Sequence, residues 1–274
     1  MDARFVFDQP HYDALNAARE ATIRRLLDSL RKDHNLRTAI DLGCGVGRFS
    51  GFLRDLGFEV LGLDGRQTNL DEAKSRFPNI DFRLMDAEDV RIRQFGQFDL
   101  VLCMGLYYHL ENPFAAFRNC SSLTRQIAIV EGMCVPGTEP ILAVRDEGPT
   151  EDQGLRHVAL YPSENGLIKL LYRAGYPHVY RFRTMPDHPN YRCSSLSKQV
   201  RTIVVAAVIP LASEVLEVAT EPATDSDPWV IRASPAAVAL RARSMAVRIW
   251  RFMGKPWRAK REILSRRWRS LLLS

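Results

Sequence analysis

The feature that most constrains this sequence is a regular alternation of short apolar runs and helix-like segments between residues 38 and 130. Each apolar run has the length of a buried strand, and the segments between the runs carry apolar residues at helical spacing. Strands are predicted at 38–42, 58–63, 80–84, 98–104 and 126–130, and helices near 48–57, 67–76 and 113–123. Because strands that alternate with helices form parallel sheets with crossover connections, the pattern predicts a doubly wound α/β fold.

The flanking segments complete this domain, which we predict at residues 1–210. Residues 132–162 show no periodicity, and an insertion of that length is predicted to be a cap over the binding site. The remaining elements are predicted as helices at 10–32 and 163–174 and strands near 178–183 and 200–209.

A glycine-rich turn follows the first predicted strand. It reads Asp41-Leu42-Gly43-Cys44-Gly45-Val46-Gly47. Glycine lets the backbone turn tightly, and the amide groups at the start of the next helix face a ligand. Asp64 ends the second strand, and Asp86, followed by Ala87, ends the third. Because the carboxyl ends of parallel strands meet at one edge of a sheet, these residues are predicted to line one site.

The spacing GxGxG, with an acid two residues before it, resembles motif I of the class I S-adenosylmethionine-dependent methyltransferases. The resemblance implies a Rossmann-like sheet of seven strands and S-adenosyl-L-methionine as the cofactor. In that family the strand-end positions bind ribose and adenine, and a carboxylate lies near the methionyl ammonium group. The cofactor-binding residues that the resemblance implies are Asp41, Gly43, Gly45, Gly47, Asp64, Asp86, Ala87 and Met104.

A nicotinamide-dependent oxidoreductase is the main rival interpretation, and a non-catalytic binding protein on the same fold is another. The dinucleotide fingerprint GxGxxG needs a third glycine at position 48, where this chain has Arg48. Asp64 suits the ribose of either cofactor, so Arg48 and the acid Asp41 are the residues that favour the methyltransferase.

The exit of the fourth strand is the predicted methyl-transfer edge, and it carries Tyr107, Tyr108 and His109. His109 is predicted to be the general base, since histidine can take a proton near neutral pH, and Tyr108 is predicted to orient the acceptor. The alternative is structural: His109 bonds a loop carbonyl and the tyrosines pack in the core. Glu131 is a weaker candidate, either for a bond from the acceptor hydroxyl or as a solvated strand end. Further weak candidates in or beside the cap are Arg145, His157, His178 and His188.

Two missing motifs narrow the methyl acceptor. No Asn/Asp-Pro-Pro-Tyr/Phe motif follows the fourth strand, which disfavours the branches of the family that methylate amides and adenine amines. No Asp-Asn pair is present to hold magnesium, which disfavours metal-assisted methylation. A metal-free transfer to an oxygen of a small molecule, glycan or lipid-linked acceptor is therefore expected.

The stretch 104–113 is similar to a subgroup of methyltransferases that includes the tRNA wobble-uridine carboxymethyltransferases and stand-alone enzymes for sugars or metabolites. An RNA-modifying activity is thus an alternative. It is disfavoured because those tRNA enzymes carry a large basic N-terminal region, and only about 35 residues precede motif I here.

Composition and cysteine usage indicate a globular protein of the cytoplasm. Hydrophobic residues make up 46% of the chain, and the longest apolar run, 202–212, is about half the ~20 residues that a bilayer span needs. The acidic start lacks the basic and apolar regions of a signal peptide. Five scattered cysteines without a CxxC pair indicate neither a disulfide framework nor a zinc site.

The basic character of the chain, +6 overall, is concentrated in residues 241–274, which hold eleven Arg and Lys against Glu262 alone. A linker is predicted at 211–240. The apolar residues of the tail's second half lie at helical spacing, at positions Trp257, Leu264, Trp268 and Leu271. A basic amphipathic helix of this kind is predicted to bind an anionic membrane surface. Docking of the helix on the main domain and RNA binding are the alternatives.

Overall fold

The computed structural model describes residues 5, 8–31, 33–146, 155, 158–194 and 197–223. The chain divides into two compact units, Met1–Pro222 and Ala223–Ser274. The predicted tail at 241–274 and the part of the predicted linker after residue 223 lie outside the described residues.

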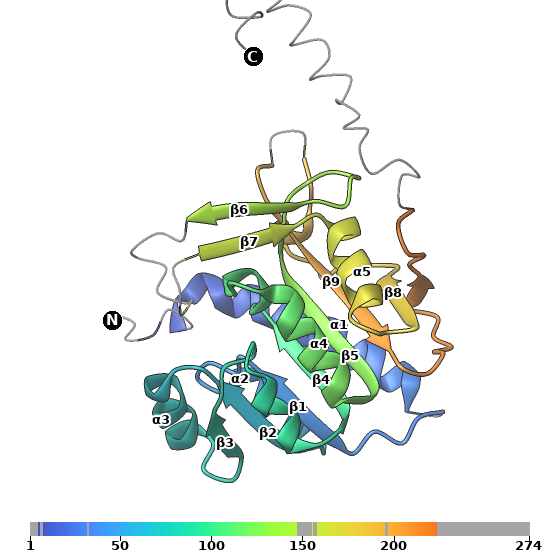
Figure 1. Cartoon of the computed structure of the whole chain (residues 1–274). Coiled ribbons are helices and arrows are strands. Elements are labelled where there is room, and N and C mark those ends of the chain that lie inside the picture. The colour runs from blue at the N-terminus through green and yellow to red at the C-terminus, as the bar shows by residue number, and fades with distance from the viewer. Residues whose placement is uncertain are drawn as a thin grey trace, which may run out of the picture. The chain divides into compact units, whose positions relative to one another are not determined.

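The first unit is built around a mixed sheet of eight strands (Figure 1). In spatial order the strands are β10 (Leu216–Val218), β8 (His178–Phe182), β9 (Val200–Ala207), β5 (Thr124–Cys134), β4 (Phe98–Met104), β1 (Thr38–Leu42), β2 (Glu59–Asp64) and β3 (Asp81–Leu84). The strands from β5 to β3 are parallel, whereas β9 runs antiparallel to both β5 and β8, and β10 antiparallel to β8. The predicted parallel α/β core is thus confirmed, with an antiparallel end added to it.

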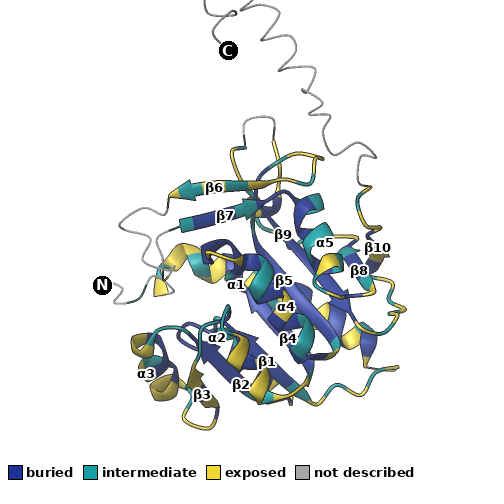
Figure 2. Cartoon of the chain, viewed as in Figure 1, coloured by how far each residue is buried: buried dark blue, intermediate teal, exposed yellow. Residues whose placement is uncertain are grey.

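Neighbouring residues of a strand point to opposite sides of the sheet, so a strand can carry apolar side chains on both faces. Helices cover both of these faces. On β4, Val101 and Cys103 belong to one apolar cluster and Leu100 and Leu102 to another. The first cluster also contains residues of α4 (Pro113–Leu123) and α5 (Glu164–Arg173), and the second contains residues of α1 (Pro10–Leu30) and α2 (Arg48–Asp55). Figure 2 shows the central strands buried between these layers. The sheet is therefore doubly wound, as predicted.

The third crossover helix, α3 (Gln67–Arg76), packs near β3 through a separate small apolar cluster. Its bounds, and those of β1, β4 and α4, equal the predicted ranges. The carboxyl ends of β1 to β5 therefore all lie along one edge, where the site was expected.

The insertion is more ordered than the sequence suggested. β5 continues to Cys134, and β6 (Leu142–Asp146) and β7 (Val158–Pro162) pair antiparallel as a separate two-stranded sheet. Only Leu155 is described between residues 147 and 157. The two strands escaped prediction because they are short and because β6 is exposed or half-buried along its length, so it leaves no buried apolar run.

The end of the sheet also differs from the expected seven strands and from the expected start of the linker. Leu216–Val218 lies inside the segment predicted as a linker at 211–240, yet it forms β10 and pairs with β8. Only Leu216 of its three residues is buried, and acidic Glu214 and Glu217 surround it, which gave the segment the composition of a linker. The sheet therefore has eight strands. Among the described helices, none is long and apolar enough to cross a membrane.

Candidate active site

The glycine-rich turn connects β1 to α2 and folds back on β2. The amides of Gly43 and Cys44 both donate to the carbonyl of Leu63, at 2.8 and 2.9 Å. Gly43 has φ +70°, and a Cβ there would lie 2.8 Å from the side chain of Leu106. Both the left-handed backbone and the close approach of the loop after β4 therefore require glycine at this position.

Asp64, at the end of β2, fixes this turn from the next strand. One carboxylate oxygen accepts from the amide of Gly45 at 2.9 Å, and the other accepts from the amide of Arg66 at 2.9 Å and from Asn69 Nδ2 at 3.1 Å. Burial raises the pKa of Asp64, while the two backbone hydrogen bonds act in the opposite direction. The structure thus brings the predicted acid and the predicted glycines together.

A cavity of about 330 Å³ opens at this edge of the sheet. Its size falls within the range of roughly 300–1,000 Å³ that is usual for small-molecule sites. Among the residues predicted from sequence, its lining includes Gly43, Asp64, Met104, Tyr108 and His109. This main cavity therefore joins the predicted cofactor residues to the predicted catalytic pair.

A side pocket of about 50 Å³ adjoins the main cavity, and Gly43, Asp64 and His109 line both. Asp86 and Ala87 line the side pocket. The carboxylate of Asp86 also accepts the amide of Glu88 at 2.9 Å, which fixes the turn after β3. Asp86 and Ala87 thus line a pocket beside Asp64, and their contact with the adenine of the cofactor stays a prediction.

Three predicted cofactor residues lie beneath the cavity surface, and they are not among its lining residues. Gly45 and Gly47 shape the turn through positive φ angles of +54° and +85°. Asp41 is fully buried and accepts a 2.7 Å hydrogen bond from Ser50 Oγ, and burial raises its pKa to about 7. In this structure Asp41 anchors the start of α2, and its predicted contact with the cofactor stays a prediction.

Tyr108 and His109 come from the short turn Tyr107–His109 (η3) after β4. Their ring centroids are 4.1 Å apart, and the ring of Tyr161 on β7 meets Tyr108 edge-on at 5.5 Å. Gly132 lets the turn pack closely against β5, because a Cβ there would lie 2.7 Å from the rings of Tyr107 and Tyr108. Tyr107 itself is a core residue whose hydroxyl donates to the carbonyl of Met133 at 3.0 Å.

A buried ionic cluster that the sequence does not reveal also borders the main cavity. Glu131, which has no exposed surface, accepts from Arg19 of α1 at 3.0 Å, from Arg201 of β9 at 2.9 Å and from the hydroxyl of Tyr191 at 2.7 Å. Arg201 Nη2 also donates to the hydroxyl of Tyr108 at 2.8 Å. Arg19 and Arg201 line the cavity. We call Arg19, Tyr108, Glu131, Tyr191 and Arg201 the basic cluster.

The structure decides between the two interpretations of Glu131. Its carboxylate is neither solvated nor open to an acceptor hydroxyl, because the guanidinium groups and Tyr191 surround it. Burial alone would raise the pKa of Glu131, but Arg19 and Arg201 hold it below its ordinary value, so the group is charged. The other weak candidates, Arg145, His178 and His188, do not line the cavity, and His157 lies outside the described residues.

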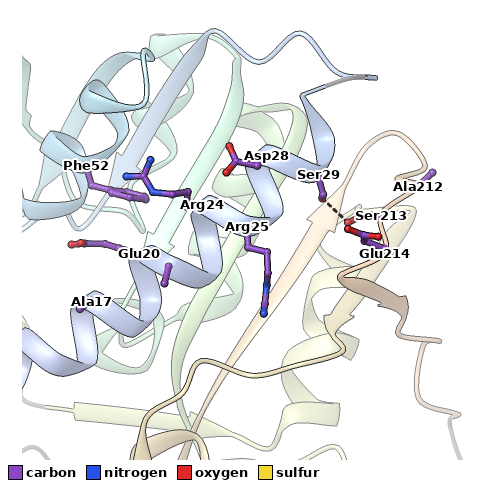
Figure 3. Close-up of a pocket in the computed structure, with 11 residues that line it drawn as sticks. Ala17, Glu20, Arg24, Arg25, Asp28, Ser29, Phe52, Ala212, Ser213 and Glu214 are labelled. Atoms are coloured by element: carbon purple, nitrogen blue, oxygen red, sulfur yellow. Dashed lines mark hydrogen bonds between the residues drawn. The ribbon is translucent and has the colours of Figure 1, made fainter.

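A larger hollow, about 860 Å³, lies along the outer side of α1 (Figure 3). It is bounded by Arg24, Arg25 and Asp28 on the helix and by Ala212–Glu214, where Ser29 and Ser213 share a 2.7 Å hydrogen bond. Its lining contains no residue of the glycine turn or of the acidic strand ends. Size alone therefore does not mark the site in this molecule.

In the part of the chain that the structure describes, no group of three or more His, Cys, Asp or Glu side chains is placed to hold a metal ion. The four cysteines in the sheet region, Cys44, Cys103, Cys120 and Cys134, are buried and unpaired as thiols, and Cys193 is exposed.

Comparison with known proteins agrees with this geometry. Residues 40–130 match the family model of a methyltransferase domain. The chain is 29% identical over 116 residues to the ubiquinone biosynthesis O-methyltransferase of Bordetella avium. These aligned residues make up 41% of this chain and 46% of the relative. It is 33% identical over 91 residues to the protein of the same name from Xanthomonas campestris, covering 31% and 38%. The chain thus spans less than half the length of these curated relatives.

Solved structures share the fold. The N-terminal domain of EvdMO1 with SAH bound superposes with a TM-score of 0.57 at 23% identity, over 69% of this chain and 80% of that one. Magnesium protoporphyrin IX methyltransferase from Synechocystis with bound SAM gives 0.50 at 20% identity, over 76% and 86%. Residues 40–130 thus match the model of a methyltransferase domain, and the chain shares its fold with solved structures that hold SAH or SAM.

Proposed function

We propose that the protein is an S-adenosylmethionine-dependent methyltransferase that acts on an oxygen atom of its acceptor. One observation carries the proposal: Asp64 accepts a 2.9 Å hydrogen bond from the amide of Gly45 in the GxGxG turn, and Asp64 lines the same cavity as His109. The curated relatives are O-methyltransferases by name, which supports oxygen as the acceptor atom.

The residues present fit the cofactor that this fold binds. When bound, S-adenosylmethionine supplies an electrophilic methyl group on a sulfonium. Asp64 already accepts three hydrogen bonds from the protein, which leaves an acceptor site that would hold a ribose hydroxyl, and the side pocket with Asp86 and Ala87 would hold the adenine. Arg48 ties α1 to the start of α2 through Asp13 and Glu20, at 3.0 and 2.9 Å, and so holds the adjoining part of α1, including Arg19, beside the glycine turn.

His109 is proposed to take the proton from the acceptor hydroxyl, because it lines both the main cavity and the side pocket. Methyl transfer is an in-line displacement, so positioning contributes as much as proton removal. Tyr108, held by Arg201, positions the acceptor next to His109.

The test is calorimetric binding of S-adenosylhomocysteine to the purified protein. Binding that Asp64→Asn weakens, and that Asp71→Asn on the exposed side of α3 leaves unchanged, supports the proposal. Binding of NADH without binding of S-adenosylhomocysteine would favour the oxidoreductase instead. Methylation of bulk tRNA, and not of small hydroxylated acceptors, would favour the RNA-modifying alternative.

We also propose that residues 241–274 attach the protein to anionic membranes, on the basis of their charge and their tryptophan and leucine spacing. The full chain should co-sediment with anionic vesicles, hardly with neutral ones, and less at high salt because the attraction is screened. A chain ending at residue 240 should stay in solution and still bind S-adenosylhomocysteine. Equal sedimentation of the two chains would contradict the proposal.

A further inference from the structure

The basic cluster contains more positive than negative charge. Two guanidinium groups, Arg19 and Arg201, share the single carboxylate of Glu131, and their side chains are only 5% and 7% exposed. The acids nearest to Arg19 in sequence are Asp13, which borders the cavity, and Glu20, and both pair instead with Arg48. An unbalanced charge that is nearly removed from water is costly, so this end of the cavity favours an anion.

Two hydrogen-bond donors of the cluster lie side by side at the cavity. Among the described residues, Arg201 Nη1 donates to both oxygens of Glu131, and Nη2 donates to the Tyr108 hydroxyl, which leaves a second N–H on Nη2. Burial raises the pKa of Tyr108, against the influence of Arg201, so the hydroxyl keeps its proton. Since this oxygen accepts from Arg201, its own hydrogen can point elsewhere. An N–H and an O–H in this arrangement match the two oxygens of a carboxylate.

The position of Arg201 separates it from the cofactor end. Arg201 is the second residue of β9, and in the sheet β5 and β4 lie between β9 and the glycine turn that follows β1. Arg19 reaches the same carboxylate from α1, on the side of the glycine turn. The cluster therefore has one guanidinium on the cofactor side and one on the far side, next to Tyr108 and His109.

We propose that Arg201 and Tyr108 bind a carboxylate group of the methyl acceptor, which makes the acceptor an organic acid. This inference rests on the proposed function, because it assigns the end of the cavity that the cofactor leaves open. A carboxylate held there fixes the rest of the acceptor beside the ring of His109, 4.1 Å from that of Tyr108.

The test titrates two small probes, benzoate and its neutral analogue benzamide, into the protein loaded with S-adenosylhomocysteine, and follows their dissociation constants by ligand-observed NMR. The wild-type protein should bind benzoate and not benzamide. Arg201→Met should weaken benzoate about 10- to 100-fold, the scale of a lost charged hydrogen bond, and Tyr108→Phe should weaken it less. Arg125→Met is the matched control, since Arg125 pairs with Asp99 away from the cavity.

Arg201→Met leaves Glu131 with Arg19 as its counter-ion, so the variant should fold. Should it not fold, Tyr108→Phe, which changes no charge, carries the test alone. Equal binding of benzoate and benzamide, no binding of either, or benzoate binding unaffected by Arg201→Met and Tyr108→Phe would each overturn the proposal.

A second arm separates the acceptor's carboxylate from the cofactor's. S-adenosylhomocysteine carries a methionyl-type carboxylate and 5′-methylthioadenosine has none. The proposal expects Arg201→Met to leave the affinity for both unchanged. A loss confined to S-adenosylhomocysteine would assign Arg201 to the cofactor and overturn the proposal. If the wild-type protein binds neither nucleoside, the proposed function fails, and benzoate titrated into the unloaded protein then shows separately whether the cluster binds a carboxylate.

Discussion

The two ends of the main cavity are built in opposite ways. The cofactor end comes from one stretch of chain, 41–87, in which a glycine turn and acidic residues follow successive parallel strands. The acceptor end that we propose, the basic cluster, takes single residues from α1, the turn after β4, β5, the segment before β9, and β9. One end presents backbone amides and carboxylates, and the other presents two guanidinium groups around one carboxylate.

This difference indicates how proteins that share a fold can bind different substrates. The cofactor end depends on local geometry at the carboxyl edge of a parallel sheet, where α/β folds bind nucleotides. The acceptor end depends on side chains that only the tertiary structure brings together, and so it can change without altering the sheet.

The largest effect should come from the residue that lies between the ends. His109→Ala should lower turnover about 100- to 10,000-fold, because it removes the group that takes the acceptor's proton, while S-adenosylhomocysteine affinity is kept. Turnover would be measured with a hydroxylated organic acid found by screening. His178→Ala, which is away from the cavity, is the control. Unchanged turnover in His109→Ala would return this residue to a structural role.

The basic cluster should contribute strongly to the free energy of unfolding. Glu131→Gln should lower the free energy of unfolding by about 3–5 kcal/mol, since it leaves two buried guanidinium groups without their carboxylate. Glu217→Gln removes one partner of the exposed Glu217–Arg183 pair, 3.7 Å apart, and should cost about 0–1 kcal/mol. Urea unfolding of both variants measures the difference. Similar losses would show that the basic cluster is not an energetic unit.

A substitution at the cofactor end should have a smaller effect, on cofactor binding. Asp64→Asn keeps an oxygen that can accept from the amide of Gly45 but removes the charge, so S-adenosylhomocysteine binding should weaken by about 1–3 kcal/mol. Calorimetry measures the change. An affinity equal to that of the wild-type protein would place the ribose elsewhere.

A further expected effect is a change in the pH dependence of stability. Burial raises the pKa of Asp41 to about 7, so between pH 4 and pH 7 the unfolded chain has released a proton that the folded protein retains. Stability should therefore fall as pH rises through this window, and Asp41→Asn should remove that decline. Glu131 has the opposite shift: its pKa is lowered in the folded protein, so its contribution is lost as pH falls below about 4.5.

Urea unfolding at several pH values separates these two contributions. A wild-type curve and an Asp41→Asn curve that run parallel between pH 4 and pH 7 would contradict the assignment to Asp41.

The two ends of the cavity also differ in how well they could be predicted from the sequence. Strand ends are readable from sequence, so the positions of Gly43, Asp64 and Asp86 at one edge were predicted from their place after apolar runs. Arg19 and Arg201 are 182 positions apart in the sequence and resemble ordinary helix and strand arginines, so no local pattern identifies them. Glu131 gave a partial signal, an acid inside a long apolar strand, but its partners could not be read from sequence. β10 was missed for a related reason, because pairing with β8, not its own composition, makes it a strand.

The most direct test of the two-ended cavity is a crystal structure of the protein with S-adenosylhomocysteine. We expect a ribose hydroxyl within hydrogen-bond distance of Asp64, the adenine beside Asp86 and Ala87, and the sulfur facing Tyr108 and His109, with Arg201 left to the acceptor. A methionyl carboxylate bound to Arg201, or an adenosine bound at the basic cluster, would contradict it.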